Sequence, residues 1–213
     1  MNSRYAAKGL EAEFEPASRG RVLRNKLGIH RLREIQAVES AALEKAQERL
    51  LERFSGTHRF ATEDVCGIHR LWLGDIYDWA GAYRGVNISK GGLMFAAAGL
   101  VPQLMAGFEQ GELRECTPCQ GMSADALAVA LARTHAELIL IHPFREGNGR
   151  CARLLAWLMA LQAGLPPLDF RPLAGRGRPA YFAAIRAAFA KDYRPLEARF
   201  KVVIERTLQP YQS

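Results

Sequence analysis

A histidine, a glutamate and three arginines lie within the twelve residues from His142 to Arg153. An imidazole titrates near neutral pH and can take the proton of an attacking hydroxyl. A carboxylate such as that of Glu146 can bind Mg²⁺, which usually takes one or two protein carboxylates together with phosphate oxygens and water. The pattern predicts a site for chemistry on a phosphate group, with His142 as general base and Glu146 as the magnesium ligand.

The run Gly147-Asn148-Gly149 leads into a predicted helix. The N–H groups of a first helical turn have no partners within the helix, and the helix dipole favours negative charge there. A phosphate therefore fits at this position. Arg150 and Arg153 are three residues apart on the opening turn, so both guanidinium groups can point to one side and hold further phosphate oxygens.

Each of these features also has a purely structural reading. A single histidine at a helix end often only satisfies local hydrogen bonds, and a Gly-Asn-Gly run is often only a turn. The joint order of base, carboxylate, glycine turn and arginines favours a functional site. Phe144, between His142 and Glu146, is expected to point inward and anchor the loop by packing.

The elements that must position these residues are mostly helical. Val86 and Ile88, followed by Gly91-Gly92, predict a small β-hairpin within residues 81–95. Apolar periodicity, with Thr62 and Ser123 as helix starts, predicts helices elsewhere. These helices are expected over residues 32–53, 62–79, 97–112, 123–140, 147–164, 178–191 and 194–208. The predicted fold class is all-α with one small hairpin.

Composition permits one sizeable core, because the 213 residues are 49% hydrophobic and 24% charged. The net charge of +7 suits anionic ligands. We expect no specific nucleic-acid partner, since the chain lacks a basic stripe interleaved with aromatic residues and lacks a zinc-finger pattern. The N-terminus has no apolar signal core, and no run approaches the ~20 apolar residues that span a membrane. A soluble, cytoplasmic protein is expected.

The four cysteines are expected to be free thiols. Cys116 and Cys119 form a C-x-x-C pair, but no second pair or spaced histidine pair completes a four-ligand zinc site. Cys66 and Cys151 fall within predicted helices, where a small buried side chain explains them.

Residues His142 to Arg153 resemble the signature of the Fic (filamentation induced by cAMP) family, H-P-F-x-[D/E]-G-N-G-R-x-x-R, and match it at every specified position. Residues 22–29 and 79–92 also resemble segments that precede this motif in bacterial members, so the resemblance covers most of residues 20–208. It implies a Fic domain over residues 29–213 after an N-terminal arm of residues 1–28. It also implies that the hairpin is a flap that aligns a segment of a target protein by strand pairing. The flap residues would be Val86, Asn87, Ile88, Ser89, Lys90, Gly91 and Gly92.

The activity that the resemblance implies is transfer of AMP from ATP to a Tyr, Thr or Ser hydroxyl of a target protein, with release of pyrophosphate. His142 would deprotonate the hydroxyl and Glu146 would bind Mg²⁺. The α- and β-phosphates would be held by the backbone of residues 147–149 and by the Asn148 side chain.

The outer phosphates would be bound by Arg150 and Arg153. Other branches of the family transfer phosphocholine or UMP, or act like kinases. The kinase-like branch departs from the G-N-G-R sequence that this chain keeps. Adenylylation is therefore favoured, while use of another nucleotide, phosphate transfer and a non-enzymatic nucleotide-binding adaptor remain alternatives.

Many members are inhibited by a helix with the pattern [S/T]-x-x-x-E-[G/N], whose glutamate pairs with the arginine at the position of Arg153. The nearest candidate, Ser40 to Lys45 with Glu44, fails at the last position, and its apolar periodicity indicates a core helix. The resemblance then implies inhibition by a separate small antitoxin protein that carries this helix. Members of that kind modify the ATPase subunits of DNA gyrase and topoisomerase IV, which are the expected targets.

Overall fold

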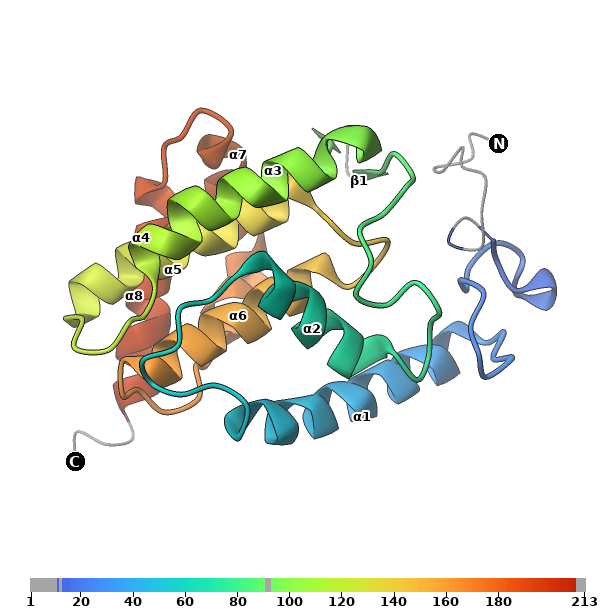
Figure 1. Ribbon diagram of the computed structural model, residues 1–213, viewed down its shortest axis with the longest axis horizontal. Coiled ribbons are helices and arrows are strands. Elements are labelled where there is room, and N and C mark those ends of the chain that lie inside the picture. The colour runs from blue at the N-terminus through green and yellow to red at the C-terminus, as the bar shows by residue number, and fades with distance from the viewer. Residues whose placement is uncertain (1–10, 12, 91–92, 210–213) are drawn as a thin grey trace. The chain divides into compact units, whose positions relative to one another are not determined.

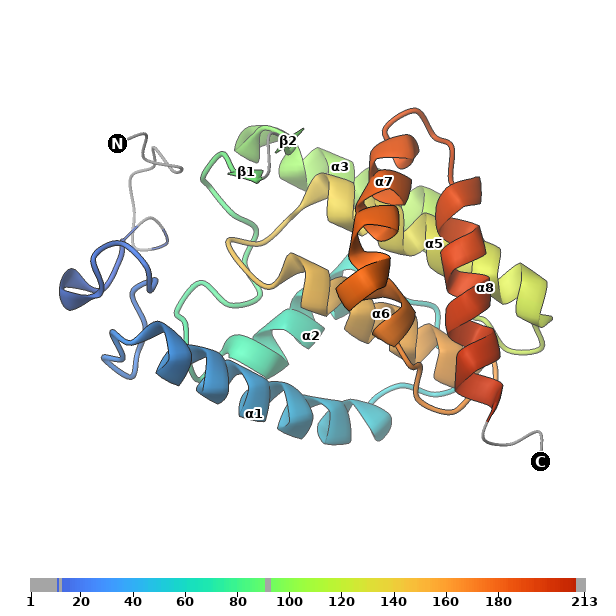
Figure 2. The same ribbon diagram turned by 180° about the vertical axis from the view of Figure 1, so that it is seen from behind.

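The computed structural model describes residues 11, 13–90 and 93–209, and most of these residues are helical (Figures 1 and 2). The α-helices are α1 (Leu32–Leu51), α2 (Thr62–Leu73), α3 (Val101–Phe108), α4 (Arg114–Cys116), α5 (Ala124–Ile141), α6 (Asn148–Gln162), α7 (Arg178–Ala188) and α8 (Arg194–Leu208). A π-helical stretch, η4 (Glu109–Leu113), joins α3 to α4. Short 3-10 turns occupy η2 (Pro16–Ser18), η3 (Ala98–Leu100), η5 (Arg171–Leu173) and η6 (Gly175–Gly177). The predicted all-α class is confirmed.

The C-terminal ends of two helices differ most from the prediction. Helix α2 ends at Leu73 and not near residue 79. Gly74 and Asp75 are weak helix formers, and the carbonyl of Ile76 accepts the Lys26 N–H at 2.8 Å from outside the helix. The helix predicted over 97–112 continues through the π-helical stretch to Cys116.

The start of α5 follows the predicted capping. The Ser123 hydroxyl accepts a hydrogen bond from the Ala126 N–H at 3.2 Å. This satisfies one of the donors that the first turn leaves without an intrahelical partner.

The predicted hairpin is present as two strands of two residues each, β1 (Ser89–Lys90) and β2 (Leu93–Met94). They pair antiparallel, with Ser89 opposite Met94 and Lys90 opposite Leu93. The turn predicted at Gly91-Gly92 lies outside the described residues.

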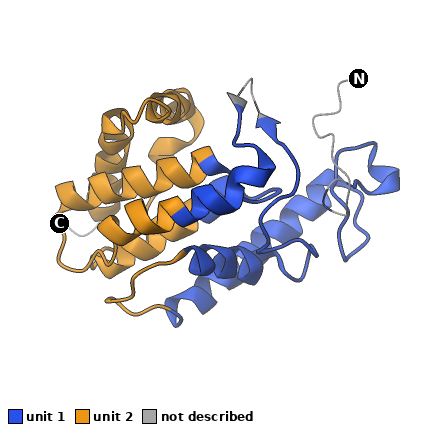
Figure 3. Cartoon of the chain, turned by 45° about the horizontal axis from the view of Figure 1, so that its top comes forward, with its two compact units in different colours: residues 1–53, 62–106, 141–151 blue, residues 54–61, 107–140, 152–213 orange. Residues whose placement is uncertain are grey.

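The chain forms two compact units (Figure 3). Unit 1 comprises residues 1–53, 62–106 and 141–151, and unit 2 comprises residues 54–61, 107–140 and 152–213. The division along the sequence into an arm of residues 1–28 and a domain of residues 29–213 stays a prediction.

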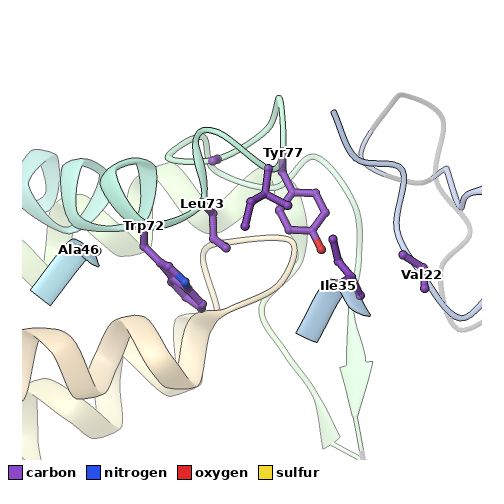
Figure 4. Close-up of a cluster of buried hydrophobic side chains, with 8 residues drawn as sticks. Val22, Ile35, Ala46, Trp72, Leu73 and Tyr77 are labelled. Carbon is purple, nitrogen blue, oxygen red and sulfur yellow. The ribbon is translucent and has the colours of Figure 1, made fainter. Parts of the chain in front are cut away.

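The core of unit 1 lies between α1 and α2, which pack against each other. Figure 4 shows Ile35 and Ala46 of α1 with Trp72 and Leu73 of α2 and with Tyr77 just after it. All five side chains are at most 3% exposed. Burial of apolar surface contributes about 25 cal/mol per Å² to stability, so this packing holds α2 in place. The residues of α2 that contact the motif of residues 142–153 are held with it.

Unit 2 is built on α5, α7, α8 and most of α6. Helices α7 and α8 pack against each other and against η5. Helix α5 buries Leu127, Leu131 and Leu138 completely. The four cysteines of the chain are free thiols, as predicted. Among the described helices, none is both long enough and apolar enough to cross a membrane.

Candidate active site

The loop between α5 and α6 carries the motif and begins with a strained residue. His142 has a φ of 53°, in the left-handed region that few residues other than glycine adopt. The Phe95 ring stacks on the His142 imidazole with centroids 3.7 Å apart and planes 12° from parallel. One face of the imidazole is therefore covered by the residue that follows β2.

Phe144 belongs to the same loop and is fully buried. Its ring stacks on His69 of α2 at 3.8 Å. The Asn148 side chain closes the loop from the other end, because its Oδ1 accepts the Phe144 N–H and its Nδ2 donates to the Phe144 carbonyl, both at 2.8 Å. The amide of Asn148 thus fixes the loop, and its predicted contact with phosphate stays a prediction.

His69 contacts the loop that carries the motif, and this role was not predicted from the sequence. Its Nδ1 accepts the Gly81 N–H at 2.8 Å, so its Nε2 carries the proton and donates to the Glu146 carbonyl at 3.0 Å. Burial lowers the pKa of His69 to about 4. The ring is therefore neutral at pH 7 and holds the backbone of Glu146 through one tautomer.

Glu146 presents its carboxylate at the start of α6. One oxygen, Oε1, accepts the Gly147 N–H at 3.0 Å, and it lies 3.9 Å from Nη2 of Arg150. The Glu146 side chain is 43% exposed. A single accessible carboxylate beside a helix N-terminus fits Mg²⁺, which completes its coordination with phosphate oxygens and water.

Gly147 and Gly149 differ in what their missing side chains allow. Gly147 has a φ of 83°, and a Cβ there would lie 2.8 Å from Cζ3 of Trp72. At Gly149 a Cβ would meet no atom within 4 Å, so the first turn of α6 borders open space. The N–H groups of this turn have no acceptor within the helix. These features suit the predicted anion site, which stays a prediction.

Arg150 is held by a buried carboxylate on α1. Its Nη1 lies 2.7 Å from Oε2 of Glu39, which is 5% exposed. The Tyr77 hydroxyl donates to the other oxygen, Oε1, at 2.7 Å, and the Trp72 indole donates to the Glu39 carbonyl at 2.9 Å. The Arg150 guanidinium also lies 4.5 Å from the centre of the Trp72 ring.

The sequence contained a signal for Glu39 that was not used. This glutamate lies four residues after Ile35 and seven before Ala46, on the buried face of α1. A charge on an apolar face is rarely left unpaired. The spacing alone could have indicated a buried ion pair, although it could not have named Arg150.

Arg153 lies on α6 within unit 2. Its guanidinium carbon is 5.9 Å from the centre of the Phe170 ring. Its Nε is buried and, among the described atoms, has no hydrogen-bond acceptor. Burial and the charge of Arg153 lower the pKa of His135 to about 3, so this histidine stays neutral.

The residues of the predicted flap are placed in unit 1. Val86 and Ile88 are buried, and the Asn87 side chain accepts the Ala98 N–H at 2.8 Å. Ser89 and Lys90 form β1, whereas Gly91 and Gly92 lie outside the described residues. The flap and the loop with His142 are joined by the backbone of Arg84, whose N–H donates to the Pro143 carbonyl at 2.8 Å.

The comparisons with known proteins identify the family. Residues 59–160 match the Fic/DOC family. The chain is 35% identical over 144 residues to the protein adenylyltransferase VbhT of Bartonella schoenbuchensis, covering 67% of this chain and 30% of VbhT. It is 32% identical over 143 residues to the probable protein adenylyltransferase Fic of Salmonella typhimurium, covering 67% of this chain and 70% of that protein.

Solved structures give the same fold. BepC of Bartonella tribocorum, solved with bound AMPPNP, superposes with a TM-score of 0.68 at 20% identity, covering 85% of this chain and 91% of BepC. The N-terminal Fic domain of Bep8 from Bartonella sp. 1-1C gives a TM-score of 0.72 at 22% identity, covering 86% and 90% of the two chains. On the strength of the sequence relatives, with the fold in agreement, the chain belongs to the Fic/DOC family.

Proposed function

We propose that the chain is a protein adenylyltransferase that moves AMP from ATP to a hydroxyl of a target protein. The observation that carries the proposal is that one short loop joins a histidine to a helix N-terminus whose first turn borders open space. His142 stands at one end of the loop, and the first turn of α6 with Gly149 stands at the other. A base and a phosphate site at this spacing suit attack of a hydroxyl on a phosphorus atom.

In the proposed step, the imidazole of His142 takes the proton of the target hydroxyl. The hydroxyl oxygen forms a bond to the α-phosphorus of ATP. The bond from the α-phosphorus to the oxygen that bridges to the β-phosphate breaks, and pyrophosphate leaves with the electron pair. The negative charge on the phosphates is stabilised by the N–H groups at the start of α6.

The remaining groups hold the nucleotide. Glu146 is proposed to bind Mg²⁺, which would neutralise phosphate charge. Arg150 keeps one side of its guanidinium on Glu39, so we assign only its remaining N–H groups to phosphate. The buried Nε of Arg153 supports a role in holding an anion, because a buried donor is costly without an acceptor. Asn148 is proposed to act through the loop and through its backbone N–H.

The comparisons support the choice of ATP. The two sequence relatives described above are named as adenylyltransferases, and BepC was solved with an ATP analogue. The matched region is only part of VbhT, so the activity is proposed for this chain on its own site. We assign the activity to a Fic domain of residues 29–213, which follows an N-terminal arm of residues 1–28. We propose that the protein acts in the cytoplasm.

The experiment uses the purified chain with Mg²⁺, cell lysate, and ATP labelled at either the α- or the γ-phosphate. We expect protein label from the α position only, lost in His142→Ala and kept in His30→Ala, a matched change at an exposed histidine. Binding of ATP should survive His142→Ala, because the anion site is separate from the base. Label from the γ position would indicate a kinase, and nucleotide binding without any label would indicate an adaptor.

We further propose, from the family resemblance, that the targets are the ATPase subunits of gyrase and topoisomerase IV and that a separate antitoxin supplies an inhibitory glutamate. Glu44 is exposed on α1, and Ser40 beside it donates its hydroxyl to the Gln36 carbonyl at 2.8 Å. The exposure of Glu44 and the hydrogen bond of Ser40 suit an ordinary helix of the fold. Purified gyrase subunits should become labelled, and Glu44→Gly should leave the rate unchanged. Activation by Glu44→Gly would mean that the inhibitor lies within this chain.

A further inference from the structure

Arg84 is a buried arginine whose side chain, among the described residues, donates hydrogen bonds to four backbone carbonyls. It is 2% exposed. Its Nε donates to the His142 carbonyl at 2.6 Å, and Nη1 donates to the Val86 carbonyl at 2.6 Å. Its Nη2 donates to the carbonyls of Ala96 at 2.6 Å and Ile141 at 3.3 Å. Two of these acceptors, Ile141 and His142, lie where α5 ends and the loop of the proposed base begins, and the other two, Val86 and Ala96, flank the hairpin.

On the side of the loop, Arg84 fixes three consecutive carbonyls. Its side chain binds those of Ile141 and His142, and its own N–H binds that of Pro143 at 2.8 Å. A left-handed φ at a residue such as His142 costs of order 1–3 kcal/mol and persists only where the surroundings determine it. The three hydrogen bonds from Arg84 supply that constraint.

On the side of the flap, Arg84 fixes both ends of the hairpin. Val86 precedes β1 and Ala96 follows β2. Phe95, next to Ala96, stacks on the imidazole of His142. One guanidinium therefore sets the hairpin and the histidine relative to each other within unit 1.

The chemistry of arginine suits this task. Burial lowers the pKa of the Arg84 guanidinium, but arginine remains charged in proteins. Its planar group directs donors along several fixed directions at once, whereas lysine offers one compact ammonium with rotatable donors. A lysine at this position could keep the charge but could not reach all four carbonyls.

We propose that Arg84 is a positioning residue for AMP transfer, which holds His142 and both ends of the flap in one arrangement. This inference rests on the proposed function. It assigns Arg84 to the positioning of the base and to the docking of the target. It does not assign Arg84 to nucleotide binding, for which we propose residues at the start of α6. Loss of Arg84 should therefore slow the chemical step and weaken target binding while ATP binding is kept.

The test compares Arg84→Lys and Arg84→Ala with Arg133→Lys, a control at an arginine that pairs with Glu112 and Glu115 in unit 2. The measurements are kcat, KM for the target, Kd for ATP and the thermal midpoint. We expect Arg84→Lys to stay folded, to lose roughly 10²-fold in kcat because small misplacements of a base are that costly, and to raise the target KM. The Kd for ATP should change by less than about 3-fold, under 1 kcal/mol.

Arg84→Ala should lose more activity, and added guanidinium ion should restore part of it. If Arg84→Ala does not fold, Arg84→Lys still decides the question. A folded Arg84→Lys enzyme with kcat and target KM within about 2-fold of the unchanged chain, or one in which ATP binding falls in step with kcat, overturns the inference.

A second readout separates this inference from the proposed function. If the unchanged chain transfers no AMP, the function fails, but the arrangement can still be measured without nucleotide. Two signals should change in Arg84→Lys. One is the imidazole signal of His142, assigned among the five histidines by His142→Ala, and the other is hydrogen exchange of the amides of residues 88–90 and 93–95. No change in either measurement would refute the role of Arg84.

Discussion

The ion pair between Glu39 and Arg150 offers a prediction whose size follows from the structure. We consider the replacement Glu39→Gln, which keeps the shape of the side chain and removes its charge. In the structure the carboxylate is 7% exposed, contacts Arg150 at 2.7 Å and accepts the Tyr77 hydroxyl at 2.7 Å. The glutamine amide can satisfy one of these donors but places its own donor against the other.

Breaking a buried ion pair on one side typically costs about 3–5 kcal/mol. Here the Arg150 side chain is 33% exposed, so water solvates the charge that is left behind, and we expect a loss of about 2 kcal/mol in the free energy of unfolding. For a chain of this length that corresponds to a thermal midpoint lower by roughly 4–8 °C. Glu44→Gln, at an exposed position on the same helix, should change the free energy by less than about 0.5 kcal/mol.

The assay is a double-mutant cycle by urea denaturation with Glu39→Gln, Arg150→Met and the two together. Methionine keeps an unbranched stem against Trp72, which the arginine now covers. We expect a coupling energy of about 1–2 kcal/mol between the two positions, so the double variant should be more stable than the sum of the single losses predicts. Additive losses, or a loss for Glu39→Gln no larger than that for Glu44→Gln, would refute the reasoning.

Three further predictions concern the loop and its support. Gly147→Ala should lower stability by about 1–3 kcal/mol in denaturation, because a φ of 83° and the Trp72 ring at 2.8 Å both oppose a Cβ. Gly149→Ala should instead gain up to about 1 kcal/mol as a helical alanine, yet bind ATP more weakly by calorimetry; unchanged ATP affinity would contradict the anion site. Stability should also fall as the pH is lowered from about 6.5 to about 4, because the unfolded state then binds a proton that folded His69, with its pKa of about 4, does not. Above this window His69 is neutral in both the folded and the unfolded state, and below it His69 is charged in both. His69→Gln should therefore flatten the slope of stability against pH. His135 contributes equally to the variant and to the unchanged protein.

The parts of the fold that follow local rules could be predicted from the sequence. Helix α8 runs from Arg194 to Leu208, as its apolar periodicity predicted. The Ser123 cap and the hairpin were also predicted correctly, since turn and capping chemistry depend on a few neighbouring residues. Helix α2 ended early, because the N–H of Lys26, 50 residues away in the sequence from Ile76, takes a carbonyl there that a helix would use.

The candidate site divides in the same way. The sequence singled out candidate residues within one motif, His142 to Arg153, and their roles stay predictions. It did not identify Glu39, His69 or Arg84, because each acts through a partner that is distant in sequence. Of the three, only Glu39 left a local signal, as a charge on the buried face of α1.

The shortness of the hairpin limits how the proposed transferase could choose its targets. Each strand has two residues, so an extended segment added to the edge of the hairpin could form about two backbone hydrogen bonds. At a net value of about 1 kcal/mol each, these bonds would change affinity by roughly 30-fold, and any polypeptide backbone could make them. The hairpin could thus set the orientation of a bound segment, while the discrimination between one protein and another would have to come from surfaces of the target beyond that segment.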